Sequence, residues 1–311
     1  MKGLLDPKMD FVFKNIFGSE KNPNILISFL NATLKPKDLI TSVEIKNTDL
    51  NKGYIEDKFS RLDVKATTSN NEIINIEIQL KNEYNMIKRS LYYWSKLYSE
   101  QLNEGEDYSI LKRTICINIL NFKYLKTRKF HSGYRLKEIY SNEELTDVAE
   151  VHFIEIPKLE EGSDEKDMLV AWIEFLKDPE SEKVRSLEMS IDEIRQAKDE
   201  LIRMSNDDTQ RELYEMRAKT LKDKISALNE AERKGIQKGM KEGMQKGIEK
   251  GAKEKAFEIA KSMINIGLDN ETISKATGLD LSEIEKLKNH WLYKRTQQTK
   301  VHKKIGPAYR S

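Results

Sequence analysis

The stretch from Arg61 to Leu80, RLDVKATTSNNEIINIEIQL, alternates polar and apolar residues on both sides of a polar centre. This alternation predicts two antiparallel strands joined by a turn, because successive side chains of a strand point to opposite faces. With the turn centred on Asn70, Asp63 and Glu77 face each other across the strands, with Cβ atoms about 5 Å apart. Opposed like charges destabilise a hairpin, so this pair requires a compensating partner.

The two faces of this hairpin differ in character. One face is apolar and is expected to pack on a core; it comprises Leu62, Val64, Ala66, Ile74, Ile76, Ile78 and Leu80. The other face carries Arg61, Asp63, Lys65, Asn75, Glu77, Gln79 and Lys81. This polar face either meets water, as in many antiparallel sheets, or is covered by the aromatic-rich helix expected over residues 86–102. A covered face cannot leave opposed carboxylates unpaired without a large free-energy cost.

A divalent cation held between Asp63 and Glu77 would compensate the pair. Mg²⁺ or Mn²⁺ prefers hard oxygen ligands, which the two carboxylates and the backbone carbonyl of Ile78 can supply. Such an ion activates a bound water and offsets charge on a phosphate, so the pair indicates phosphodiester hydrolysis. Gln79 lies on the same face and can orient the attacking water, although it lacks the positive charge of a lysine. We expect no small-molecule cofactor.

The composition limits the class of protein. The chain has 311 residues, 38% of them hydrophobic, which is enough for a substantial core. Lys and Arg total 54 against 52 for Asp and Glu, so the net charge by itself indicates no nucleic-acid partner. The single Cys116 rules out an intrachain disulfide and is typical of a reducing compartment. With neither a signal-like start nor a long apolar run, we expect a cytoplasmic protein without membrane contact.

Residues 1–160 are predicted to form an α/β domain with a central mixed sheet flanked by helices. Helical spacing of apolar residues covers about residues 8–32, and the hairpin and the helix that follows it come next. Further strand patterns occupy residues 42–46, 113–122 and 150–156. From residue 161 the chain is expected to be all-α, with a densely charged helical arm or bundle over residues 161–230.

A glycine recurs every four residues in the predicted helical linker over residues 231–255, at Gly235, Gly239, Gly243, Gly247 and Gly251. Small residues at this spacing let two helices approach closely, but each glycine costs about 1 kcal/mol of helix stability relative to alanine. A marginal helical linker is therefore favoured over a self-association stripe.

The C-terminal residues divide into two segments. Residues 256–288 show three helical runs separated by glycine turns, which fits a helix-turn-helix or a plain three-helix cap. Residues 289–311 form a basic, aromatic-containing tail that is expected to be disordered, with phosphate contact as the alternative.

Several segments occur together in the order seen in one known family: Asp10–Phe17, Arg61–Val64, Ile76–Gln79, Arg89–Trp94 and Gly105–Tyr108. Asp63 followed by Glu77-Ile78-Gln79 is similar to the Asp…Glu-x-Gln variant of the PD-(D/E)XK nuclease motif. With its neighbours, it resembles the Rpn family of recombination-promoting nucleases, also described as PD-(D/E)XK transposase-like proteins. The resemblance covers about residues 4–160, and the glycine repeat with its following turns is similar to family C-termini.

The resemblance implies a restriction-endonuclease-like core, Mg²⁺-dependent cleavage of DNA, and a role in recombination or mobile elements. It makes Asp63 and Glu77 metal ligands and places Gln79 where the motif usually has lysine. Asp10 matches an acidic residue of the family's first helix, where it would be an accessory carboxylate, and Lys14 lies one turn on. The alternative for Asp10 and Lys14 is an ordinary first-turn acid with an i+4 cation.

The favoured function is a metal-dependent DNA endonuclease, an enzyme that hydrolyses phosphodiester bonds. The alternative is a catalytically inactive DNA-binding or oligomerisation protein with a nuclease-like fold. A homodimer is favoured if both strands are cut, because each chain has one metal site. A serine or cysteine hydrolase is not supported, since His131, His152, His290 and His302 fall in no triad or zinc spacing.

Overall fold

The structure is a computed structural model that describes residues 3–46, 63–164 and 166–304, with side chains up to residue 292. The chain divides into two compact units, Met1–Ile225 and Ser226–Ser311, and the boundary falls inside helix α7 (Asp208–Asn265). The predicted hairpin residues Arg61 and Leu62 lie outside the described residues.

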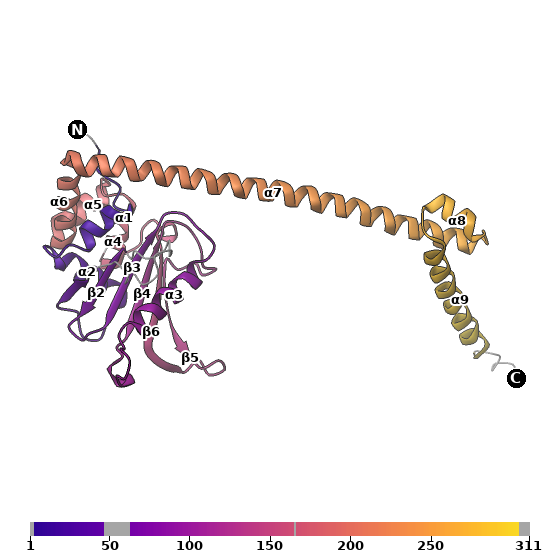
Figure 1. Cartoon of the computed structure of the whole chain (residues 1–311), viewed down its shortest axis with the longest axis horizontal. Helices are drawn as coiled ribbons and strands as arrows, with labels where there is room; N and C mark the ends of the chain where they lie inside the picture. The colour runs from indigo at the N-terminus through magenta and orange to yellow at the C-terminus, as the bar shows by residue number, and fades with distance from the viewer. Residues whose placement is uncertain (1–2, 47–62, 165, 305–311) are drawn as a thin grey trace. The chain divides into compact units, whose positions relative to one another are not determined.

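A six-stranded mixed sheet forms the centre of the first unit (Figure 1), in the order β1-β2-β3-β4-β6-β5. The neighbours among β3, β4 and β6 run parallel, whereas β1 with β2, β2 with β3, and β5 with β6 run antiparallel. This arrangement confirms the predicted mixed sheet. The strands are β1 (Val43–Lys46), β2 (Val64–Thr68), β3 (Ile73–Gln79), β4 (Thr114–Leu120), β5 (His131–Lys137) and β6 (Glu144–Glu155).

The register of the β2–β3 hairpin is the one that the sequence predicts. Val64 pairs with Ile76 and Ala66 pairs with Ile74, so the pairing is symmetric about Asn70. Asn71 occupies the left-handed region with a φ of 61°, which asparagine tolerates better than most residues. Extending the register by one residue beyond Val64 places Asp63 opposite Glu77.

The apolar face of the sheet packs on a layer of helices. Its residues Val64, Ala66, Ile74, Ile76 and Ile78 are buried in one cluster with residues from α1 (Asp10–Phe17), α2 (Pro23–Leu34), α4 (Met168–Lys177), α5 (Glu182–Ser190) and α6 (Asp192–Asn206). Within the segment 161–230, where a helical arm or bundle was expected, α4 to α6 pack against the sheet and join its core. The physical reason is that α4 buries eight consecutive residues, from Leu169 to Leu176, and cannot stand alone in water.

Helix α3 (Met86–Ser99) covers the polar face of β3, β4 and β6, as expected of the covering helix. Tyr93 and Leu97 of α3 are buried against Ile73, and Ser90 accepts a hydrogen bond from Nδ2 of Asn118 on β4 at 2.9 Å. Glu77 is consequently only 2% exposed. The alternative of a water-facing polar face is wrong at this position.

Strand β5 and the first half of β6 have no counterpart in the sequence-based prediction. The two strands pair antiparallel, and most of their residues outside the last half of β6 are exposed or half-buried. Without a buried face, these residues show little of the hydrophobic alternation that marks a strand.

The second unit ends in three packed helical segments, the last part of α7, α8 (Asn270–Thr277) and α9 (Leu281–Lys304). Their buried cluster consists of Ala260, Ile264, Ile273, Leu279 and Ile284. Gly278 terminates α8 in the left-handed region with a φ of 71°. Helix α9 extends to Lys304 into the segment where a disordered tail was expected, and Leu287 and Trp291 pack against this cluster. Residues 305–311 lie outside the described part.

The glycine repeat lies within α7, and every residue from 231 to 255 is exposed. None of the described helices combines the length and the apolar composition needed to cross a lipid bilayer.

Candidate active site

Glu77 is a buried carboxylate in the middle of the sheet. Its Oε2 accepts a hydrogen bond from Nη2 of Arg89 at 2.9 Å, whereas its buried Oε1 has no hydrogen-bond partner among the described residues. Burial raises the pKa of Glu77 to about 7, even though the Arg89 guanidinium acts in the opposite direction. The Asn75 amide also lowers this pKa but makes no hydrogen bond of normal geometry with Oε1. Glu77 therefore has one oxygen available for a further ligand.

Asp63 lies just before β2 and is half-buried. Its Oδ2 accepts a hydrogen bond from the backbone N–H of Ile78 at 2.7 Å, which fixes the carboxylate beside β3. Burial and the negative charge of Glu77 raise the pKa of Asp63 well above its usual value, and Asp10 raises it further. The structure thus places Glu77 and Asp10 each within electrostatic reach of Asp63.

These carboxylates fit a hard divalent cation. The buried Oε1 of Glu77 without a donor and the repulsion between Asp63 and Glu77 are both relieved by a positive charge between them. No group of three or more His, Cys, Asp or Glu side chains in the described part of the chain could hold a metal ion. A bound ion would therefore need backbone oxygen, water or phosphate oxygen to complete its coordination, and the Ile78 carbonyl stays the predicted third protein ligand.

Arg89 is a site residue that the reasoning from the sequence missed. It lies on α3, pairs with Glu77, and its guanidinium carbon is 5.4 Å from the centre of the Tyr93 ring. Burial, followed by the charge of Glu77, raises the pKa of Tyr93. Arg89 could have been found in the sequence, because the segment Arg89–Trp94 lies on the helix that was expected to cover the carboxylates.

The two predicted residues of the first helix have different surroundings. Asp10 is the first residue of α1, and its Oδ2 pairs with Nη1 of Arg217 at 3.0 Å. Lys14 lies one turn further along α1 and is exposed. Asp10 is thus close enough to influence Asp63, whereas Lys14 is not among the residues that line the neighbouring cavity.

A cavity of about 410 Å³ is lined by Asp10 and by Ile78 and Gln79, which follow Glu77 in β3, whereas Asp63 and Glu77 are not among its lining residues. Its walls combine the start of α1, the end of β3 and the first part of α7: Lys8, Met9, Asp10, Ile78, Gln79, Leu80, Arg217, Thr220, Leu221 and Lys224. Gln79 is half-buried there, and its backbone carbonyl accepts a hydrogen bond from the N–H of Asn121 at 2.9 Å. A larger cavity of about 650 Å³ is lined by residues of α2, of the segment that leads into α4 and of the start of α6, and none of the predicted site residues lines it.

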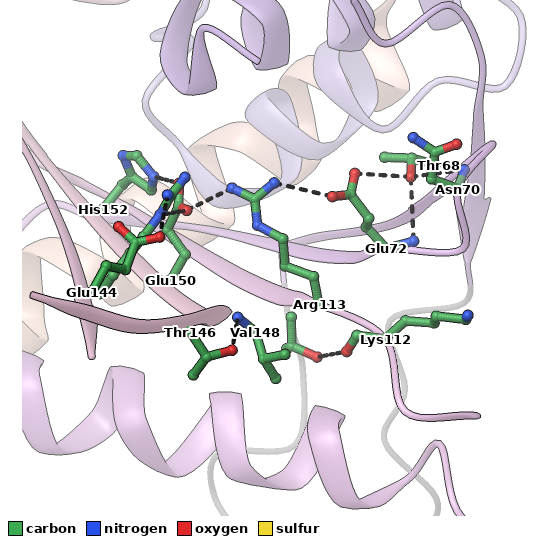
Figure 2. A network of polar contacts seen from close by, with 12 residues as sticks. Thr68, Asn70, Glu72, Lys112, Arg113, Glu144, Thr146, Val148, Glu150 and His152 are labelled. Atoms are coloured by element: carbon green, nitrogen blue, oxygen red, sulfur yellow. Dashed lines mark hydrogen bonds and ion pairs between the residues drawn. The ribbon is translucent and has the colours of Figure 1, made fainter. Parts of the chain in front are cut away.

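A second polar network runs from Glu72 at the β2–β3 turn through Arg113, just before β4, to Glu150 on β6 (Figure 2). Glu150 accepts hydrogen bonds from Arg113, Arg135 and His152, and Arg113 also contacts Glu72. Burial opposes ionisation of Glu150, but the hydrogen bonds from His152 and Arg113 lower its pKa to about 2. This network ties β5 and β6 to the neighbouring strands. Arg113 and Arg135 thus balance the buried charge of Glu150.

The fold and the paired carboxylates together define a nuclease-like domain, and the comparison with protein families agrees. Residues 7–231 match the model of the PD-(D/E)XK nuclease family transposases, and the chain belongs to this family. Residues 253–289 match the C-terminal HTH domain of the Rpn/YhgA-like nuclease family, which agrees with the resemblance noted in the sequence. No curated protein and no solved structure gives a significant match to the chain.

Proposed function

We propose that this chain is a metal-dependent DNA endonuclease whose metal site is formed by Asp63 and Glu77. The observation that carries the proposal is the opposed carboxylate pair, with Glu77 buried and Asp63 half-buried, in which Oε1 of Glu77 has no donor among the described residues and both pKa values are raised. Perturbed carboxylates beside a cavity are typical of functional sites, because stability alone would remove them. The match of residues 253–289 to an HTH domain supports DNA as the substrate.

The roles of the residues follow from their contacts. When bound to Asp63, Glu77 and the Ile78 carbonyl, Mg²⁺ or Mn²⁺ would lower the pKa of a coordinated water and offset charge on the scissile phosphate. Arg89 holds the Glu77 carboxylate in position, and the Ile78 N–H holds that of Asp63. The Gln79 amide oxygen orients the attacking water by accepting one of its hydrogens. The water oxygen bonds to phosphorus as one ester P–O bond breaks; a water proton passes to solvent, and the leaving oxygen takes one up.

A plasmid-nicking assay tests this proposal. Supercoiled DNA is incubated with Mg²⁺ or Mn²⁺ and the wild-type protein, Asp63→Ala or Glu77→Ala. We expect the wild-type protein to nick DNA and a chelator to abolish this nicking. Each variant should reduce nicking by more than about a hundredfold, because mutating a residue that only hydrogen-bonds to a metal ligand already costs about 10–100-fold in activity. Equal nicking by all three proteins removes the nuclease assignment.

A catalytically inactive DNA-binding protein is the second candidate. It is favoured by the absence of a three-residue metal cluster among the described side chains and by Gln79 at the position of the usual lysine. In that case metal-free DNA binding is measurable and unaffected by Asp63→Ala, while no protein preparation nicks DNA with either metal.

The proposal includes a biological role, an oligomeric state and a cellular location. Membership of a transposase family supports a role in recombination or mobile-element behaviour. Cutting both strands with one site per chain favours a homodimer. The cytoplasmic location expected from the sequence stays a prediction.

A further inference from the structure

We propose that Arg217 and Lys224 of α7 form a phosphate-binding subsite beside Gln79, which holds the DNA backbone next to the scissile bond. The subsite would supply the positive charge that the site lacks at Gln79. The inference rests on the proposed nuclease function and extends it to residues outside the motif.

The cavity that is lined by Asp10 and Gln79 is also lined by these two cations. Arg217, Thr220, Leu221 and Lys224 are spaced by three, four and seven residues, so they share one face of the helix. This face forms one wall of the cavity, and Asp10 and Gln79 lie on the other walls. All of these residues belong to the first compact unit.

The charge lining the cavity favours an anion. Among its ionisable lining residues, Lys8, Arg217 and Lys224 are cationic and only Asp10 is acidic. The volume of about 410 Å³ falls in the range of roughly 300–1,000 Å³ that is typical of small-ligand sites, so a nucleotide-sized part of a strand fits. A phosphodiester is the anion that the proposed reaction brings to this position.

The present partners of the two cations can be exchanged. Arg217 pairs with Asp10, whose side chain is 54% exposed, and the Lys224 side chain, paired with Glu83, is 61% exposed. Exposed pairs of this kind contribute little to stability, whereas arginine binds phosphate through two parallel hydrogen bonds. Lys8 differs, because its Nζ donates to the Leu176 carbonyl at 2.9 Å and is only 13% exposed. Arg217 and Lys224 are therefore the phosphate ligands.

A merely structural role is the competing explanation. The guanidinium carbon of Arg217 lies 5.2 Å from the centre of the Phe11 ring, so Arg217 also attaches α7 to α1. A structural anchor would change the thermal midpoint without changing the salt dependence of DNA binding. Phosphate binding by Arg217 would therefore change the salt dependence of DNA binding, whereas a purely structural role would change only the thermal midpoint.

The test compares full-length Arg217→Ala/Lys224→Ala with Lys219→Ala/Lys222→Ala, which removes two exposed cations of the same helix that do not line the cavity. Binding of a duplex oligonucleotide is measured without divalent metal at several salt concentrations. We expect the slope of log K against log[salt] to fall by about 1 to 2 in the first variant and to stay unchanged in the second. Arg217→Lys should keep the slope.

Cleavage supplies the second measurement. At saturating DNA and metal, we expect single-turnover cleavage by Arg217→Ala/Lys224→Ala to fall about a hundredfold, comparable to the loss of one donor to a developing charge. Lys224→Ala alone, which removes only an exposed pair, should show part of the effect without loss of folding.

The outcomes separate the two proposals. An unchanged salt slope together with unchanged cleavage in Arg217→Ala/Lys224→Ala overturns the subsite, as does a lowered thermal midpoint with wild-type slope and cleavage. If the wild-type protein cuts no DNA under any condition, the nuclease proposal fails, and the salt slope still decides whether the cavity binds phosphate.

Discussion

At the scale of single residues, the metal-free site is under electrostatic strain. Asp63 and Glu77 lie opposite each other, and the burial of each raises its pKa. A cation that neutralises the pair should therefore stabilise the fold as well as support catalysis.

We expect Mg²⁺ to raise the free energy of unfolding of the wild-type protein by about 1.4 kcal/mol at ten times its dissociation constant. Asp63→Asn should lose this response and, without metal at pH 8, should be at least as stable as wild type, since an amide oxygen can still accept the Ile78 N–H. Thermal unfolding with and without Mg²⁺ measures both effects. Exposed Asp38→Asn is the matched control, and a wild-type Mg²⁺ response in Asp63→Asn would contradict the assignment.

His131 should give a pH dependence of stability. Burial, together with the charges of His152 and Lys35, lowers its pKa from 6.5 to about 4, with Asp167 and Glu150 acting in the opposite direction. Between these two pH values the unfolded chain binds more protons than the folded one, so stability is lost as pH falls from 6.5 to 4. The thermal midpoint of His131→Asn should fall less steeply over this window than that of wild type. Exposed His290→Asn should retain the wild-type slope, and equal slopes in all three proteins would exclude a role for His131.

At the scale of elements, α3 makes the polar face of the sheet into a buried site. Arg89 extends from this helix to Glu77, and Tyr93 and Leu97 close the face against water. The helix was predictable from the 3.6-residue spacing of its apolar residues, but its contact with β3 depends on packing.

Arg89→Ala should lower the free energy of unfolding by about 3–5 kcal/mol, because it leaves the Glu77 charge buried without its partner. Lys88→Ala, at the exposed neighbouring position of α3, should stay within about 0.5 kcal/mol of wild type. Chemical denaturation at pH 8 in the absence of metal measures both. Similar small changes in the two variants would show that Arg89 does not balance Glu77.

At the scale of the whole molecule, the glycine repeat of α7 requires a physical explanation. An added Cβ at Gly235, Gly239, Gly243, Gly247 or Gly251 would meet no atom within 4 Å. The glycines are thus not required by packing in the described part of this chain, and they weaken α7 within the second unit.

Gly239→Ala/Gly243→Ala should increase helix content and stabilise the helix by about 1 kcal/mol per substitution. Circular dichroism at 222 nm measures the helix content, and sedimentation equilibrium measures the molecular mass. An unchanged mass is expected for a linker, whereas a decrease would show that the glycines form a contact between copies of the chain. A matched surface substitution, Gln237→Ala, should change neither quantity appreciably.

The sequence by itself determined the β2–β3 hairpin, its register and the opposition of Asp63 to Glu77. The reason is that strand alternation has a period of two, so a turn centred on Asn70 fixes every cross-strand pair at once. The sequence also indicated the mixed sheet and the covering helix, because the spacing of apolar residues can be read without knowing which residues they contact. It missed β5, whose exposed residues carry no such pattern.

Only the tertiary structure decided which charges meet. Arg89 is 12 residues from Glu77, and Arg217 is 207 residues from Asp10, and no periodicity relates such partners. The same holds for α4 to α6, whose place in the core depends on the sheet that they cover. Local patterns encode the face that a residue occupies, whereas ion pairs and cavities depend on how distant elements pack. The carboxylate pair could therefore be predicted, whereas its balancing arginine and the neighbouring cavity could not.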